Sequence, residues 1–172
     1  MSIDKNSIIP FMKKDEIDSI VKSLAKKIEQ DYFGKELILI CPLRGSIHFL
    51  TDLSKLIKLN LKIDFVHLAS TEKSGSIKII KDISENITGK HVIIVEEIID
   101  TGKTLNFLKN RLLVSNPASL KIVTLLDKPS RREISLKPDY IGKSIDDRYV
   151  IGYGMDSEDL GRNYSEILFF KN

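Results

Sequence analysis

Short apolar runs alternate along this chain with segments whose apolar residues recur every three or four positions. The runs are too short for helices and rich in β-branched residues, as in strands buried in a parallel sheet. The strands we predict are 37–41, 63–68, 77–81, 91–95 and 120–126. The helices we predict from their amphipathic spacing are 15–32, 49–61 and 103–113. Strand and helix in alternation predict an α/β fold with a mostly parallel sheet of about five strands flanked by helices.

Two segments depart from this alternation. Residues 69–77 are small and polar, which predicts a mobile loop. Residues 128–172 are irregular, with short strands expected near Tyr140 and at 149–153, and predict a cap on the core. A chain of 172 residues can bury one hydrophobic core, so we expect a single domain.

Charge and composition exclude several classes of protein. The chain has 27 Lys and Arg against 24 Asp and Glu, and its net charge of +3 is too small to indicate a nucleic-acid partner. The single cysteine, Cys41, allows no internal disulfide and no thiolate metal cluster, which fits a reducing cytoplasm. There is no basic leader followed by an apolar stretch and no apolar run of membrane-spanning length, so we expect neither secretion nor a membrane span.

The candidate chemistry lies after the third long strand. We expect that strand to end at Glu96 and Glu97, at the sheet edge where α/β proteins bind ligands. Residues 100–104 follow at once and precede a helix, so they offer backbone N–H groups, two hydroxyls and a helix N-terminus to an anion such as phosphate. A simpler interpretation is a helix cap, in which Asp100 or Thr101 only satisfies free amides.

Gly102, Lys103 and Thr104 also look like the end of an ATP-binding P-loop. That motif requires a glycine five positions before the second glycine, where this chain has Glu97. A carboxylate there would face the phosphates, so we reject an ATPase. Paired acids suit ribose hydroxyls or a hard cation instead, which predicts a sugar phosphate as ligand.

Residues 92–105, VIIVEEIIDTGKTL, resemble the phosphoribosyl pyrophosphate motif of type I phosphoribosyltransferases, in their hypoxanthine-guanine branch. Three further segments match in the family's order: 42–46 resembles the pyrophosphate loop, 125–132 the purine-facing segment and 149–156 the hood over the base. The resemblance spans roughly residues 37–164. It implies a core of about residues 15–130 and a small hood from about 1–14 and 131–172.

The implied activity is purine salvage. The resemblance predicts transfer of the phosphoribosyl group from phosphoribosyl pyrophosphate to N9 of hypoxanthine or guanine, giving IMP or GMP and pyrophosphate. It also implies Mg2+ as cofactor and a homodimer or homotetramer. Two alternatives remain: a regulator that senses phosphoribosyl pyrophosphate with little catalysis, and a phosphoribosyltransferase that prefers xanthine.

The resemblance assigns a role to each matching residue. Asp100 is implied as the general base near purine N7, and Lys128 as the donor to the 6-oxo group. The implied phosphoribosyl ligands are Glu96, Glu97, Asp100, Thr101, Gly102, Lys103 and Thr104. The implied pyrophosphate ligands are Leu43, Arg44, Gly45, Ser70 and Arg162, with a cis peptide bond between Leu43 and Arg44. The implied purine ligands are Lys128, Tyr149, Val150, Met155 and Asp156, and the implied metal ligands are Asp156 and Glu96.

Two positions depart from the family's pattern. Glu97 stands where an aspartate is usual, and one extra methylene would shift the ribose contact by about an ångström. The family's Ser-Tyr pair, which closes over the transition state, is Ser70-Thr71 here, so we expect Ser70 to reach pyrophosphate without an aromatic lid. We expect Arg131 and Arg132, at the end of the purine-facing segment, to lie at the surface or in a subunit contact.

Overall fold

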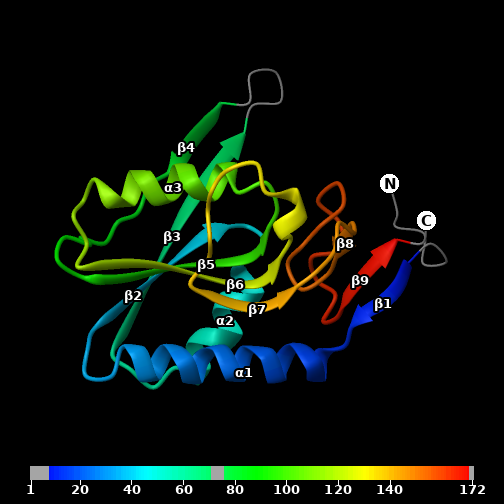
Figure 1. The fold of residues 1–172 in the computed structure, drawn as a ribbon, viewed down its shortest axis with the longest axis horizontal. Helices are drawn as coiled ribbons and strands as arrows, with labels where there is room; N and C mark the ends of the chain where they lie inside the picture. Colours follow the sequence, from blue (N-terminus) through cyan, green and yellow to red (C-terminus); the bar gives the residue numbers. More distant parts are fainter. Residues whose placement is uncertain (1–7, 71–75, 171–172) are drawn as a thin grey trace.

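A computed structural model describes residues 8–70 and 76–170, and its core is a six-stranded sheet in the order β4-β3-β2-β5-β6-β7 (Figure 1). The strands are β2 (Leu37–Leu43), β3 (Leu61–Ser70), β4 (Ile77–Lys81), β5 (His91–Ile99), β6 (Ser119–Asp127) and β7 (Tyr140–Ser144). All neighbours are parallel except β4, which runs antiparallel to β3. The predicted α/β fold with a mostly parallel sheet is confirmed.

Helices cover both faces of this sheet. Helices α1 (Lys14–Asp31) and α2 (Ile47–Leu56) pack on one face and α3 (Lys103–Leu113) on the other (Figure 1). Successive side chains of a strand point to opposite faces of the sheet. Leu39 therefore packs with α1 and α2, and Ile40 packs with α3. Helix α2 ends earlier than predicted because Ile57 adopts extended backbone. Within the described ranges, no helix has both the length and the apolar character to cross a membrane.

Two sheet boundaries differ from the prediction. Strand β5 continues through both acids to Ile99, so its predicted end at Val95 was wrong. Buried Ile99 explains the extension, since the apolar pattern resumes after the acids. Strand β7 pairs parallel with β6, so the core sheet includes residues beyond the expected limit of about 130.

The two ends of the chain form a second, smaller sheet. Strands β1 (Ile8–Met12), β9 (Ile167–Phe170) and β8 (Val150–Ile151) pair antiparallel in the order β1-β9-β8 (Figure 1). This sheet is the hood that the resemblance implied, although β9 was not predicted. It is tied to the core through Tyr153, whose hydroxyl donates to Asp52 of α2 at 2.7 Å.

Both ends of the segment 69–77, which was predicted to be a mobile loop, belong to strands. Strand β3 continues to Ser70 and β4 begins at Ile77. The rest of the prediction, including Thr71, lies outside the described residues, as does the side chain of Ser70.

Candidate active site

The turn between β5 and α3 is built on Gly102. Its φ of +83° lies in the left-handed region, and a Cβ there would come within 3.1 Å of the Arg132 side chain. The Gly102 carbonyl accepts the first hydrogen bond of α3, from the N–H of Asn106 at 2.9 Å. The first N–H groups of α3 therefore stand free of intrahelical partners at the end of the turn.

Segment 128–133 holds this turn in place. Two backbone hydrogen bonds join them, from Lys128 N to Ile99 O at 3.0 Å and from Glu133 N to Thr101 O at 3.1 Å. The Arg132 guanidinium adds a third link, because it donates to the carbonyl of Asp100 and pairs with the buried carboxylate of Asp127. Arg132 thus links the turn to segment 128–133 from a largely buried position, and its expected exposure at the surface was wrong.

The Asp100 carboxylate contacts Arg131. The Arg131 Nε lies 3.1 Å from Asp100 Oδ1, and its Nη1 lies 3.6 Å from a carboxylate oxygen of Asp147. The side chains of Arg131 and Asp100 are 46% and 47% exposed. Arg131 is exposed as predicted, yet its contacts belong to the candidate site, which the sequence did not indicate.

Two cavities meet beside this turn. Their volumes are about 190 and 230 Å³, and Glu96, Thr104 and Leu105 line both. Each is smaller than the roughly 300–1,000 Å³ of typical ligand pockets, so a ligand of ordinary size would extend through both. Of the predicted residues, the first cavity is lined by Leu43, Arg44, Gly45, Glu96, Glu97, Thr104 and Arg162. The second is lined by Glu96, Asp100, Thr101, Gly102 and Thr104.

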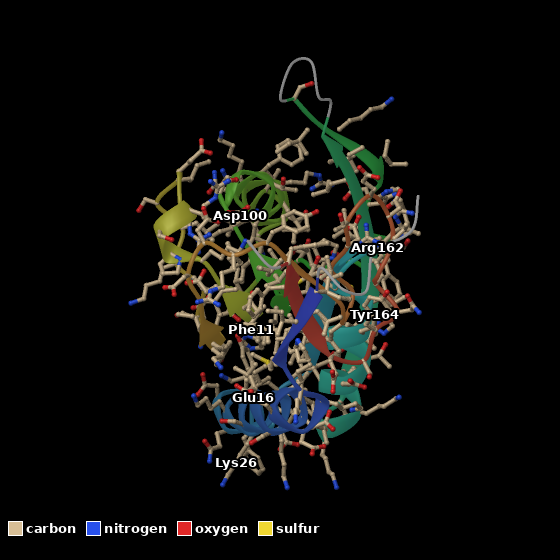
Figure 2. The ribbon with its side chains drawn as sticks, turned by 90° about the vertical axis from the view of Figure 1, so that its right-hand side faces the viewer. Phe11, Glu16, Lys26, Asp100, Arg162 and Tyr164 are labelled. Carbon is tan, nitrogen blue, oxygen red and sulfur yellow. The ribbon has the colours of Figure 1, made fainter. Side chains whose placement is uncertain are left out.

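Figure 2 looks onto the hood and shows how the cavity residues are distributed. Asp100 of the second cavity and Arg162 of the first lie toward the same end of the molecule, away from Lys26 of α1. The hood also meets the loop after β2. A Cβ on Gly154 of the hood would overlap the carbonyl of Gly45 in that loop.

The loop after β2 has the backbone that the resemblance implied. The peptide bond between Leu43 and Arg44 is cis. Gly45 lies against the Glu97 carboxylate, and buried Ser46 donates its hydroxyl hydrogen to that carboxylate. Arg44 reaches outward to Asp159, at 2.5 Å.

The two glutamates interact with each other. Burial, followed by the neighbouring charge of Glu97, raises the pKa of the Glu96 carboxyl well above its usual range. Burial also raises the pKa of Glu97, although the Ser46 hydroxyl and the Arg162 guanidinium oppose it. Such a pair favours a bound cation or hydroxyl donors, which relieve the repulsion between two carboxylates.

Arg162 organises the hood side of the first cavity. Its Nη1 donates to the Gly154 carbonyl at 2.9 Å, and its Nη2 pairs with Asp156 at 2.6 Å and with Asp159 at 3.2 Å. The other oxygen of Asp156 accepts the N–H of Asp159 at 2.8 Å. In the described part of the chain, Arg162 Nε is a buried donor without a hydrogen-bond partner, a state that proteins rarely leave uncompensated.

The predicted purine ligands form a separate group outside the walls of the two cavities. Lys128 is buried, with Nζ 3.9 Å from Asp147. Tyr149 is 58% exposed, and its hydroxyl donates to the Asp156 carbonyl at 3.1 Å. Val150 and Met155 are buried in the hood. The structure therefore brings the phosphate and ribose candidates together and places the purine candidates on neighbouring hood and loop segments.

One predicted phosphate ligand points elsewhere. Lys103 Nζ forms an ion pair with Glu133, and both side chains are more than half exposed.

Three residues that sequence reasoning missed are Ser46, Asp147 and the Asp100 partner Arg131. Their partners are distant in sequence or belong to loops without periodicity, so no local pattern marks them.

The parallel core, the antiparallel hood and the β5–α3 turn together form the fold of a type I phosphoribosyltransferase. The chain belongs to the family of the phosphoribosyl transferase domain, whose model matches residues 13–158.

Named relatives agree with this membership. The chain is 42% identical over 157 residues to a hypoxanthine-guanine phosphoribosyltransferase of Staphylococcus aureus, covering 89% of this chain and 88% of the relative. A crystal structure of a hypoxanthine-guanine phosphoribosyltransferase from Bacillus anthracis superimposes with a TM-score of 0.92 at 42% identity, covering 96% of this chain and 99% of the other. A hypoxanthine phosphoribosyltransferase structure from Staphylococcus aureus gives a TM-score of 0.93 at 39% identity, covering 99% and 95%.

Proposed function

We propose that this protein is a magnesium-dependent purine salvage enzyme that transfers the phosphoribosyl group of phosphoribosyl pyrophosphate to N9 of hypoxanthine or guanine. One observation carries the proposal: two cavities meet at Glu96. One lies beside the cis-peptide loop and has Arg44 and Arg162 in its wall, and the other lies beside the β5–α3 turn. A sugar with a phosphate at one end and a pyrophosphate at the other fits this arrangement. The names of the relatives support the same reaction.

The 5′-phosphate is assigned to the second cavity. An anion there is favoured by the N–H groups of the first turn of α3, the positive end of the helix dipole and the hydroxyls of Thr101 and Thr104. Of these N–H groups, that of Lys103 also donates to Thr101 Oγ1, at 3.4 Å. Gly102 lets the backbone approach closely. Lys103 contributes its backbone N–H, and its side chain also reaches the phosphate if it leaves Glu133.

Pyrophosphate is assigned to the first cavity. Leu43, Arg44 and Gly45 offer backbone groups in its wall, and Arg162 offers a guanidinium. The unpartnered Nε of Arg162 supports this role, because an oxygen of the ligand would satisfy a donor that is otherwise left without one in the described residues. Ser70 completes the set as a proposal from the family's pattern, at the end of β3.

Asp100 is assigned as the general base. As the bond from C1′ to pyrophosphate breaks and the bond to N9 forms, the purine loses its N7 proton, which the Asp100 carboxylate accepts. Arg131 holds this carboxylate through an exposed ion pair, which is worth only about 0–1 kcal/mol and therefore gives way easily.

Lys128, Tyr149, Val150 and Met155 are assigned to the purine. Buried Lys128 would donate to the 6-oxo group, and that donor would oppose the amino group of adenine. The half-exposed ring of Tyr149 offers a face for stacking, and Val150 a backbone edge. Met155 is buried in the hood.

Mg2+ is proposed to bind with the substrate's oxygens. Among residues 8–70 and 76–170, no group of three or more His, Cys, Asp or Glu side chains is arranged to hold a metal ion. That fits Mg2+, which commonly uses one or two carboxylates, waters and substrate phosphates. Glu96 lines both cavities and suits a first ligand, whereas Asp156 already binds Arg162 and the N–H of Asp159 and suits a contact through water. When bound, the ion would neutralise charge on the departing pyrophosphate.

A direct assay tests the proposal. Purified protein, phosphoribosyl pyrophosphate and Mg2+ are mixed with hypoxanthine, guanine, xanthine or adenine, and nucleotide formation is followed. We expect turnover with hypoxanthine or guanine. Xanthine as the best substrate would support the second enzyme alternative, adenine as the sole substrate would overturn the role of Lys128, and binding of phosphoribosyl pyrophosphate without turnover would support a regulator.

A further inference from the structure

Glu97 faces the pyrophosphate loop with both oxygens of its carboxylate. Oε2 accepts the hydroxyl hydrogen of Ser46, whose side chain is fully buried. Oε1 occupies the place where a Cβ on Gly45 would stand. Its neighbour Glu96 lines both cavities, whereas Glu97 lines only the first of the two.

The contact with Gly45 continues into the hood. Gly45 lies between the Glu97 carboxylate on one side and Gly154 on the other, where a Cβ on Gly154 would overlap the Gly45 carbonyl. The Gly154 carbonyl in turn accepts a hydrogen bond from Arg162 at 2.9 Å. A continuous chain of contacts therefore runs from the Glu97 carboxylate through the pyrophosphate loop to Arg162 of the hood.

The length of the Glu97 side chain makes this contact possible. An aspartate would withdraw the carboxylate by one carbon–carbon bond, roughly 1.5 Å. The Ser46 hydroxyl would lose its acceptor, and the close approach to Gly45 would be lost. Because Ser46 is buried, its hydroxyl would not find water easily in exchange.

We infer that Glu97 is a positioning residue of the pyrophosphate loop and not a ribose ligand, so that Glu96 alone offers a carboxylate to the ribose. This inference rests on the proposed function, since it concerns how the same site binds pyrophosphate. Glu97 fixes the backbone of Arg44 and Gly45 in the conformation that meets the ligand. Its chemistry is neither acid–base nor metal binding.

Steady-state kinetics and pyrophosphate binding test the inference. Shortening the side chain in Glu97→Asp should raise KM for phosphoribosyl pyrophosphate, and the Kd for pyrophosphate measured by calorimetry with Mg2+, by about tenfold. The kcat and the KM for hypoxanthine should stay within about threefold, because the lost contact serves ground-state binding. A ribose ligand would behave oppositely: restoring the family's aspartate would leave the KM unchanged or lower it, and either result overturns the inference.

Three further variants separate positioning from general structure. Glu97→Gln keeps the length and can still accept the Ser46 hydrogen, so it should bind pyrophosphate within about threefold of the wild type. Ser46→Ala should weaken binding, and combining it with Glu97→Asp should add little, whereas additive effects of the two would refute their coupling. Glu36→Asp shortens an exposed glutamate, paired with Lys90, just before β2 begins and is the matched control. Thermal unfolding of each variant would check that it folds.

Failure of the inference and failure of the proposed function give different results. Calorimetry with pyrophosphate needs no turnover, so it tests Glu97 even in an inactive protein. A wild type that forms no nucleotide with any of the four bases contradicts the proposed function. A wild type that turns over, with a Glu97→Asp variant that binds pyrophosphate equally well, contradicts the inference alone.

Discussion

Two acids of the same site are held in opposite ways. Asp100 is paired with Arg131, and about half of each side chain is exposed to water. Glu97 is bonded to Ser46, which is fully buried. An exposed ion pair contributes about 0–1 kcal/mol, whereas a buried hydroxyl that loses its partner costs about 1–3 kcal/mol. This difference in exposure fits the proposed roles, in which Asp100 exchanges its partner during the reaction and Glu97 keeps its own.

The surroundings of each acid fit this division. Arg131 also lies 3.6 Å from Asp147. In the proposed reaction, Arg131 can therefore keep an ion pair with Asp147 when Asp100 binds the substrate. Ser46 sits at the start of α2, between the loop and the helix, where a moving hydroxyl would disturb both. The predictions below test this contrast, beginning with the largest expected effect.

Replacing Asp100 by Asn removes the proton acceptor while keeping its shape. We expect kcat to fall by about 10²- to 10⁴-fold, the contribution typical of a general base. The Kd for phosphoribosyl pyrophosphate and the free energy of unfolding should change little, because the lost ion pair is exposed. Single-turnover kinetics measures the rate of the chemical step, its dependence on phosphoribosyl pyrophosphate concentration gives the Kd, and urea denaturation gives the free energy of unfolding. Turnover close to the wild type would show that Asp100 is not the base.

Replacing Arg162 by Lys tests an arginine that is more buried than the exposed pair of Asp100 and Arg131. A lysine keeps the charge but cannot donate at once to Gly154, Asp156 and Asp159. We expect kcat/KM for phosphoribosyl pyrophosphate to fall by about 10- to 100-fold, with a loss of unfolding free energy of roughly 2 kcal/mol.

Arg111→Lys is the control for this substitution. Arg111, in the last turn of α3, pairs with Asp82. Both side chains are partly buried, as Arg162 and Asp156 are. We expect its kcat/KM to match the wild type. If both variants lose activity equally, the effect of Arg162 is a general effect on stability and not a role in the site.

The same contrast explains how much of the site the sequence predicts. The β5–α3 turn is contiguous, so its glycine, its hydroxyls and the helix after it are recognisable from residue order alone. Ser46 and Glu97 are 51 residues apart, and their contact depends on β2 lying beside β5, which no local pattern encodes. The contact of Arg131 with Asp100 likewise joins positions 31 residues apart, so Arg131 could be placed at the surface but not in the site.

Fold boundaries failed for a related reason. Acids normally interrupt a buried strand, so β5 was expected to end before Glu96. At the carboxyl end of a parallel sheet, side chains face a cavity instead of the core, and the strand continues to Ile99. A short strand was expected near Tyr140, and β7 lies there, but its place beside β6 in the core sheet was not predicted. Strand β9 is short, and only its pairing with β1 and β8 identifies it.

Asp64 supplies a buried acid outside the candidate site, 7% exposed, for comparison with Glu97. It accepts hydrogen bonds from the backbone N–H groups of Phe65, Ser84 and Glu85. Burial alone raises its pKa, but these amides and Lys81 outweigh burial and lower the pKa below the usual 3.8. The resulting stabilisation is present above the unfolded pKa and is lost as pH falls through the folded pKa.

Asp64→Asn should therefore cost roughly 2 kcal/mol of unfolding free energy at neutral pH. The penalty should shrink as the solution is acidified below pH 3.8, because the wild-type carboxylate then becomes protonated. Urea denaturation across this pH range measures it, while KM values at neutral pH should not change. A penalty that is constant with pH would mean that the charge of Asp64 contributes nothing to stability.

Arg131→Ala has the smallest expected effect and the sharpest dependence on salt. Losing an exposed ion pair should change kcat/KM by less than about fivefold. Salt screens exposed charges over about 3 Å at 1 M but about 30 Å at 0.01 M, so the difference from the wild type should be largest at low salt and vanish at high salt. The effect of Glu97→Asp should persist at both, because a buried hydroxyl–carboxylate contact is poorly screened. If the effects of both variants vanished together at high salt, the exposure of Asp100 and the burial of Ser46 would not account for their different roles.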